Sequence, residues 1–245
     1  MIEKEGIVVR VTQIKERDAM IQIITNDGFF SFLARGVLKV DSKNALFVSL
    51  YTHARFELEE GKNGYYSLKG GTLLHSPASS MNDLLYLLTF SSIAELAMKF
   101  FDENTVKDYY PYLSAIFMAV YEKSGDPLTL VSIGACTALK LSGYAIQTSG
   151  CVTCGTKKDI VSFDMDNGGF FCRKHYDPAT MQNQTPSFLK AVRFLFIVPP
   201  EEVKNYTLNE QDLIPILNQI HQFMLDFCGV NWKGYELLLR AVRKM

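Results

Sequence analysis

Within the first 75 residues, apolar and polar positions alternate in part with the two-residue period of β-strands. Runs rich in β-branched and aromatic side chains predict five strands, over residues 6–14, 19–25, 29–36, 45–60 and 65–74. Asn26-Asp27-Gly28 predicts a hairpin between the second and third strands, because these residue types tolerate the positive φ of a tight turn. A second predicted turn, Gly61-Lys62-Asn63-Gly64, separates the last two strands. Five strands in so short a segment indicate a small closed barrel, since closure removes exposed edges.

After residue 78 the apolar positions recur with the period of an α-helix. Ser79 or Ser80 is a candidate N-cap for a helix that runs to about Phe101. Asp126-Pro127 and Thr185-Pro186 each combine a capping side chain with proline at the first helical position. The further helices that we predict cover residues 106–123, 126–143, 185–198, 215–227 and 232–243.

The first predicted helix includes the most apolar long stretch of the chain, residues 81–101. It contains Asp83, Glu95 and Lys99, whose charges would be costly in a bilayer, so we interpret it as a buried helix of a soluble domain. Asp83 and Glu95 themselves are interpreted as solvated helix positions. The patterns together predict an α+β, multidomain chain, with a β-barrel over residues 1–78 and a helical domain over residues 79–245.

Composition indicates a folded protein of the cytoplasm. Apolar residues make up 48% of the chain, which is enough to bury a substantial core. The N-terminus lacks a basic segment followed by an apolar run and a cleavage site, so we expect a cytoplasmic location. In that reducing compartment, clustered cysteines favour a metal site over disulfides.

A paired cysteine motif interrupts the helical region at about residues 148–178. Its spacing is C-x2-C-x17-C-x2-H, and its members are Cys151, Cys154, Cys172 and His175. Zinc prefers four such ligands in a tetrahedron, and each tight turn supplies two of them. The residues between the turns predict a short β-hairpin, as in a zinc knuckle or ribbon. Asp177 is an alternative fourth ligand if His175 points away.

The ligand set favours a structural metal over a catalytic one. A catalytic zinc keeps an open position for water, whereas two paired turns fill all four positions. A redox C-x-x-C is another alternative, but it requires no second pair. The sequence contains no G-x-x-x-x-G-K-[ST], G-x-G-x-x-G, G-x-S-x-G or H-E-x-x-H motif. We therefore predict one structural zinc per chain and no enzymatic activity.

Basic and aromatic residues are interleaved through the predicted barrel, which is typical of proteins that bind single-stranded nucleic acid. The alternative is that aromatic side chains fill the barrel core, the stronger interpretation for Phe30 and Phe32, which share one face of a strand. Glu57, Glu59 and Glu60 and a net charge of −1 also oppose nucleic-acid binding. Composition alone therefore leaves open a zinc-stabilised protein-interaction scaffold that does not bind nucleic acid.

A barrel, an apolar helical region and a zinc knuckle, in that order, resemble the RecO family of bacterial recombination mediators. The matching segments follow one another along the whole chain. They are Gly6–Arg10, Thr25–Gly28, Ala34–Gly36, Ser42-Lys43, Leu141–Tyr144, Cys151–Gly155 and Gly168-Gly169 before Cys172.

This resemblance implies an OB-fold barrel and a protein of recombinational repair without enzymatic turnover. RecO-like proteins bind single- and double-stranded DNA, anneal complementary strands, and with RecR help load the recombinase on DNA coated by single-strand binding protein (SSB). A cytoplasmic, nucleoid-associated location is also implied. The DNA contacts that the resemblance indicates are Arg10, Arg35, Lys39 and Lys43.

A site for a peptide partner is predicted on the helix that begins near Thr185. Lys190 and Arg193 lie three apart on this helix and so share a face, next to an excess of apolar residues. Such a face would suit the SSB tail, which the resemblance implies to be acidic with an apolar last residue. The plainer alternative is a central helix that packs on several sides.

Overall fold

The computed structural model of the chain describes residues 1–61, 64–80, 82–144 and 146–243. The chain forms two compact units, Met1–Asp83 with Phe101–Lys123 and Leu84–Phe100 with Ser124–Met245. The first unit contains a barrel and one helix, and the second contains the other α-helices and the cysteine motif. The division between residues 78 and 79 stays a prediction. Among the described residues, no helix has both the length and the apolar character needed to span a membrane.

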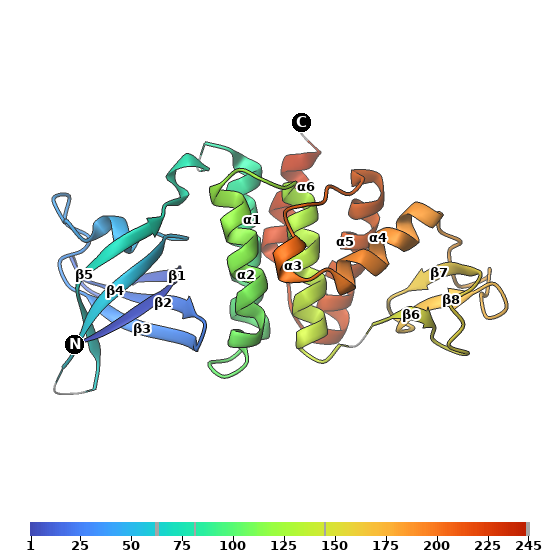
Figure 1. Ribbon diagram of the computed structural model, residues 1–245, viewed down its shortest axis with the longest axis horizontal. Helices are drawn as coiled ribbons and strands as arrows, with labels where there is room; N and C mark the ends of the chain where they lie inside the picture. The colour runs from blue at the N-terminus through green and yellow to red at the C-terminus, as the bar shows by residue number, and fades with distance from the viewer. Residues whose placement is uncertain (62–63, 81, 145, 244–245) are drawn as a thin grey trace. The chain divides into compact units, whose positions relative to one another are not determined.

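The barrel is built from five strands, drawn from blue to cyan in Figure 1. These strands are β1 (Ile2–Gln13), β2 (Ala19–Thr25), β3 (Gly28–Ala34), β4 (His53–Glu60) and β5 (Tyr66–His75). Their order is β1-β2-β3-β5-β4, with β4 antiparallel to β1 and β5 parallel to β3. This closed five-stranded arrangement is that of an OB-fold barrel, so the predicted α+β fold with an N-terminal barrel is confirmed.

The predicted hairpin and the aromatic core of the barrel are both confirmed. Thr25 pairs with Gly28 across the turn between β2 and β3. Gly28 has a φ of 135°, and a side chain there would collide with the carbonyl oxygen of Glu103, so glycine is required on both counts. Phe32 is buried with its ring centroid 5.0 Å from that of Phe56. Lys62 and Asn63 of the second predicted turn lie outside the described residues.

The strand that we predicted over residues 45–60 is wrong in its first half. Ala45–Phe47 forms a single 3₁₀ turn, η1, and β4 begins only at His53. The apolar residues Phe47 and Val48 nevertheless reach the barrel, where they pack on its core. Tyr51 has a φ of 65°, which no strand residue adopts. The apolar run therefore closes the barrel core without joining the sheet.

The first predicted helix also starts later than expected. The helix α1 spans Leu84–Phe100, and Pro77–Ser79 forms a separate 3₁₀ turn, η2, capped by Ser76. Ser80 does not cap α1, because its buried hydroxyl donates to the carbonyl of Val120 at 2.7 Å. That bond belongs to the first unit, whose helix α2 spans Val106–Tyr121.

The second unit is a helical bundle around α3. Every residue of α3 from Leu128 to Leu139 is buried, because α3 packs on α1, α4 and α5. The helices of this unit are α1, α3 (Pro127–Leu141), α4 (Pro186–Ile197), α5 (Glu210–Cys228) and α6 (Lys233–Val242), with a short turn η3 (Pro200–Glu202) after α4. The apolar excess of α1 is therefore explained by packing against α3 and α6.

Glu95 is not the solvated residue that we predicted. Its carboxylate accepts hydrogen bonds from the backbone N–H groups of Lys233 and Gly234, at 3.1 and 2.6 Å, where α6 begins. It also pairs with Lys99 at 2.7 Å. A carboxylate at this position satisfies free N–H groups and opposes the positive end of the helix dipole. Glu95 thus fixes α6 to α1.

A small three-stranded sheet lies between α3 and α4 in sequence. Its strands are β6 (Gln147–Cys151), β7 (Ile160–Asp164) and β8 (Gly169–Cys172), in the order β6-β8-β7. The predicted hairpin is the β7–β8 pair. Strand β6 was missed because its sequence, QTSGC, has no apolar alternation.

Candidate metal centre and nucleic-acid interface

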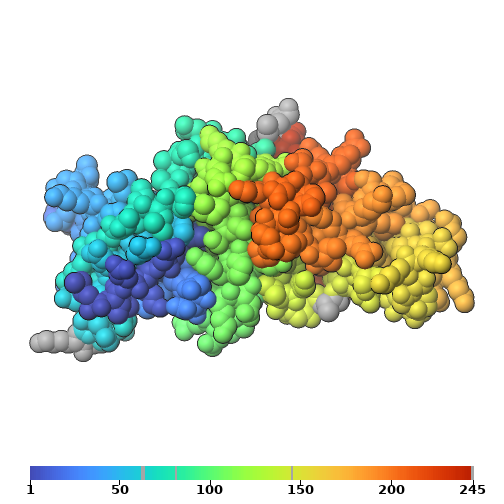
Figure 2. All heavy atoms as spheres, in the orientation of Figure 1, coloured from blue at the N-terminus to red at the C-terminus, as the bar shows by residue number. Residues whose placement is uncertain are grey.

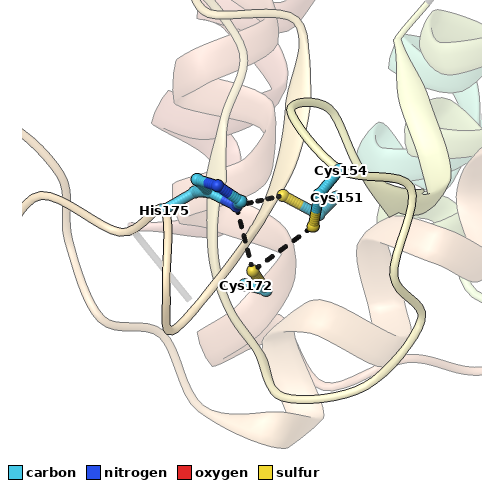
Figure 3. Close-up of side chains that lie close together, drawn as sticks. All are labelled: Cys151, Cys154, Cys172 and His175. Carbon is cyan, nitrogen blue, oxygen red and sulfur yellow. Dashed lines mark hydrogen bonds between the residues drawn. The ribbon is translucent and has the colours of Figure 1, made fainter.

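Four side chains of the β6–β8 segment converge on one point (Figure 3). Cys151 ends β6 and Cys154 lies in the turn that follows, while Cys172 ends β8 and His175 lies three residues later. The turns are closed by backbone hydrogen bonds, from Gly155 to the carbonyl of Cys151 and from His175 to that of Cys172. Two tight turns therefore present two side chains each, as the sequence spacing predicted. We call this segment, residues 147–176, the knuckle.

The distances within this group fit a tetrahedral metal ion. One atom from each residue can be chosen so that all four lie within 4.8 Å of one another. The sulfurs of Cys154 and Cys172 are 3.9 Å apart, and Nδ1 of His175 lies 3.7 Å from the sulfur of Cys151 and 3.4 Å from that of Cys172. A tetrahedron with Zn–S bonds of about 2.3 Å has S–S edges of about 3.8 Å. The four residues can therefore hold a metal ion, and three soft sulfurs with one imidazole suit zinc.

The electrostatics of the cluster favour one thiolate, at Cys151, and oppose a second at Cys154. Burial opposes ionisation of Cys151, but backbone N–H donors and His175 outweigh it and lower the pKa of its thiol to about 6. The backbone N–H of Thr156 acts in the same direction on Cys154, yet burial and the neighbouring thiols raise the pKa of Cys154. Several sulfurs so close together repel one another when ionised. A divalent cation would remove that repulsion.

His175 and not Asp177 belongs to the cluster. The carboxylate of Asp177 accepts hydrogen bonds from the backbone N–H of Ala179 at 2.9 Å and from the hydroxyl of Thr180 at 3.2 Å. Asp177 thus stabilises the turn that leaves the knuckle. That Cys151, Cys154, Cys172 and His175 bind a metal remains a proposal.

A second candidate surface is the outer face of β1, β2 and β3. Val11, Ile21 and Phe32 belong to or pack on the barrel core, so strand alternation places the residues beside them on the outside. The register pairs Arg10 with Gln22, and Gln22 with Ser31. The next outward row joins Met20 to Leu33, and Leu33 to Ser67. Arg10 therefore lies on the same outer face as these residues, and we call it the β1–β3 face.

The β1–β3 face ends in a hollow of about 630 Å³. Its lining residues are Ile14, Met20, Leu33, Arg35, Gly61, Tyr65 and Ser67. Tyr65 is 70% exposed, although it is aromatic, and its carbonyl accepts a hydrogen bond from the N–H of Gly61. The hollow thus combines an apolar floor, an exposed aromatic ring and the Arg35 side chain. Tyr65 begins the fifth strand that the sequence predicted, but the sequence gave no sign that it would lie beside Arg35.

The other two predicted DNA contacts lie in the loop after β3. Lys39 and Lys43 are exposed there. Backbone and side-chain bonds tie this loop to the β1–β2 turn, since Leu38 donates to the carbonyl of Arg17 and Gly36 to the carboxylate of Asp18. The turn also carries Lys15 and Arg17, two cations that our prediction of DNA contacts left out.

Some of the basic residues of the barrel form ion pairs and others do not. Lys4 pairs with Asp27, Arg55 with Glu5, and Lys69 with Glu59. In the described part of the chain no salt bridge involves Arg35, Lys39 or Lys43, although Asp41 lies in their loop. Positive charge is therefore available at the Arg35 end of the barrel even though the whole chain is nearly neutral.

Lys190 and Arg193 lie on the exposed side of α4, and both line a cavity of about 280 Å³. The other wall of this cavity comes from the knuckle. The lining residues are Thr148, Ser149, Gly150, Lys157, Ile160, Phe170, Pro186, Leu189, Lys190 and Arg193. The prediction named the two cations of α4 and an apolar surface beside them but missed the knuckle residues of the lining, such as Lys157 and Phe170.

An OB-fold barrel, joined in one chain to a helical unit that carries a Cys₃His cluster able to hold a metal ion, defines a class of multidomain α+β proteins. Comparison with known proteins places the chain within that class. It belongs to the recombination protein O (RecO) family.

The family match covers both parts of the chain. Residues 1–77 match the family model for the N-terminal part of recombination protein O, and residues 81–226 match that for the C-terminal part. Relatives named DNA repair protein RecO include that of Listeria innocua, 23% identical over 236 residues, which cover 96% of this chain and 92% of that protein. Those of Bacillus mycoides and Bacillus cytotoxicus are 25% and 26% identical, over 96% of this chain and 95% of each relative. The resemblance seen in the sequence is thereby confirmed.

Proposed function

We propose that this chain is a recombinational DNA repair mediator. It binds single- and double-stranded DNA, anneals complementary strands and, with RecR, helps to load the recombinase on SSB-coated DNA. The family match supports a role in DNA repair, and the relatives carry that name. The observation that carries the DNA-binding part is the hollow at the end of the β1–β3 face, where Arg35 lies beside an exposed aromatic ring and the exposed Lys39 and Lys43 follow in the next loop.

The chemistry of this face suits a single strand. Arg35, Lys39 and Lys43 would neutralise phosphates, which supplies most of the sequence-independent affinity for DNA. Tyr65 would stack on a base over the apolar floor of the hollow, and stacking tolerates any base. Arg10 would extend the phosphate path along β1. Annealing then needs charge neutralisation and alignment of two strands, for which no nucleophile or catalytic base is required.

We further propose that Cys151, Cys154, Cys172 and His175 hold one structural zinc ion. The fit of the four ligand atoms to a tetrahedron supports this assignment. Four protein ligands leave no position for a reacting water, so the ion would stabilise the knuckle and take no part in chemistry. This supports the expectation that the protein is not an enzyme. The proposed DNA partner is consistent with a cytoplasmic, nucleoid-associated protein.

Strand annealing tests the proposed function. Two complementary oligonucleotides coated with SSB should pair faster in the presence of the protein and RecR than without them, with no nucleotide cofactor in the reaction. Pairing is read as loss of donor fluorescence between labelled strands. An unchanged rate at every protein concentration would contradict the annealing role and favour the alternative, a zinc-stabilised interaction scaffold that does not bind nucleic acid.

We also propose that the cavity between α4 and the knuckle binds the tail of SSB. The cations Lys157, Lys190 and Arg193 surround an apolar floor, and none of the described residues that line the cavity is acidic. An acidic peptide that ends in phenylalanine with a free carboxylate complements this lining.

Replacing Arg193 by alanine should weaken binding of that peptide several-fold and make it less sensitive to salt, because one charge-assisted contact is lost. Fluorescence anisotropy of a labelled peptide measures the change. Arg240→Ala is the matched control, since Arg240 is an exposed cation of the same unit that does not line the cavity. Equal affinity in both variants would remove α4 from the peptide site.

A further inference from the structure

The two walls of the α4–knuckle cavity are held in place by different means. The α4 wall belongs to the helical core, where Val192 and Leu195 of the same helix are buried with 0% and 1% exposure. In Figure 2 the yellow spheres of the knuckle adjoin the orange spheres of the following helix, and β6 and β7 both contact α4. The knuckle wall, by contrast, is made of short strands and turns, so its geometry depends on what joins them.

The proposed metal ligands connect the segments that form the knuckle wall. Gly150, which lines the cavity, immediately precedes Cys151, and Lys157 lies three residues after Cys154. Phe170, which forms the floor, lies two residues before Cys172. Gly150, Lys157 and Phe170 are therefore each within three residues of a cysteine of the cluster, and Ile160, which also lines the cavity, pairs with Cys172 across β7 and β8.

Backbone contacts show how closely these segments depend on one another. Cys151 pairs with Phe170 across β6 and β8, and the N–H of Val152 donates to the carbonyl of Phe170 at 2.8 Å. A side chain at Gly150 would lie 2.6 Å from the carbonyl oxygen of Gly155, so only glycine allows β6 to approach the turn that follows Cys154. A shift of one cysteine turn would therefore move the Lys157 side of the cavity as well as its floor.

We propose that the metal site and the peptide cavity are thermodynamically coupled, so that the metal-loaded chain binds an acidic, phenylalanine-ended peptide more tightly than the metal-free chain. The inference rests on the proposed peptide partner and adds its regulation by metal. Four ligands that join the two turns hold Lys157 and Phe170 opposite Lys190 and Arg193. Without the metal only the α4 wall keeps its geometry. Coupling between two sites typically changes affinity by about 5- to 150-fold, and it is reciprocal.

The test is a titration of a labelled peptide of this kind into the full chain, loaded with zinc or stripped by a chelator. The metal-free chain should bind at least about fivefold more weakly. Lys157→Ala should weaken binding to the loaded chain and have little further effect on the stripped chain, whereas Lys190→Ala should weaken both. Fluorescence of Trp232, which is buried in the helical unit, controls for loss of the whole fold. A saturating concentration of peptide should raise the affinity of the chain for zinc by the same factor, as measured by competition with a chelator.

Equal peptide affinity with and without metal would overturn the coupling and leave the peptide partner standing. Absence of binding to the loaded chain would overturn the peptide partner, and the coupling with it. A single-stranded oligonucleotide provides a further test of the peptide partner. If the oligonucleotide displaces bound peptide, and Lys190→Ala weakens binding of the oligonucleotide but not of the peptide, the cavity is a nucleic-acid site. The peptide partner and the coupling would then both be overturned.

Discussion

Replacement of Cys154 by serine is expected to abolish tight zinc binding and to unfold the knuckle. Serine supplies no thiolate, so only three ligands of the Cys₃His set remain. Zinc binding contributes about 10–16 kcal/mol in zinc-finger peptides near pH 7, and in such small motifs that energy is folding energy. Metal analysis should show that the zinc content falls from about one ion per chain in the parent protein to nearly none in the purified variant. Limited proteolysis should then cleave within residues 147–176, which stay resistant in the parent protein.

Cys228→Ser is the matched control for this change. Cys228 is a half-buried cysteine at the end of α5 that does not belong to the cluster. That variant should keep its zinc and its resistance to protease. Retention of zinc in the Cys154 variant, or a parent protein that binds no zinc, would contradict the assignment of the ligands.

The second large effect is expected at the β1–β3 face. Joint replacement of Arg35 and Lys43 by alanine should weaken binding of single-stranded DNA equally for oligonucleotides of unrelated sequence. Each lost phosphate contact should flatten the dependence of log affinity on log salt by about 0.7, so the double variant should lose about 1.4 of that slope. Tyr65→Ala should instead weaken the binding free energy for single-stranded DNA by about 1–3 kcal/mol. The dependence of log affinity on log salt should change little, because stacking releases no counterions. Fluorescence anisotropy at several salt concentrations measures both quantities.

Lys107→Ala is the control for these variants. Lys107 is an exposed cation of α2 in the same unit and does not line the hollow. Its affinity and salt slope should match those of the parent protein. If the Arg35–Lys43 variant behaves like this control, the DNA surface lies elsewhere on the molecule.

The cysteine cluster could be predicted because its members lie close together in sequence within each turn. Two turns of four residues bring their own ligands together, so the spacing of Cys151, Cys154 and Cys172 already defines most of the geometry. The alternative between His175 and Asp177 needed the structure, since it depends on the path of the chain after β8. Strand β6 could not be found, because backbone pairing with β8 holds it and its side chains carry no pattern.

The proposed nucleic-acid face shows the opposite situation. The sequence identifies Arg35 and Tyr65 as basic and aromatic, but their proximity depends on barrel closure and on the register of β3 against β5. The pairing of Lys69 with Glu59 and of Arg55 with Glu5 is likewise a matter of register. Net charge therefore understated the positive character of one end of the barrel.

The role of Glu95 was missed for a related reason. On its own helix it occupies a position that is typical of a solvated carboxylate. Its partners are backbone N–H groups more than 130 residues further along the chain, as the contacts with Lys233 and Gly234 show. The pattern of side chains in a sequence does not predict a contact with backbone groups so far along the chain.

The most direct test of the account is the salt dependence of DNA binding by the unmodified, zinc-loaded protein. Two single-stranded oligonucleotides of unrelated sequence should be titrated at about 50 and about 200 mM salt, the range over which phosphate contacts change affinity strongly. We predict similar affinity for both sequences and a slope of log affinity against log salt steeper than about −1.4, the value for two phosphate contacts. No binding to either oligonucleotide, or binding that does not change with salt, would contradict a DNA surface on the barrel and leave the interaction scaffold.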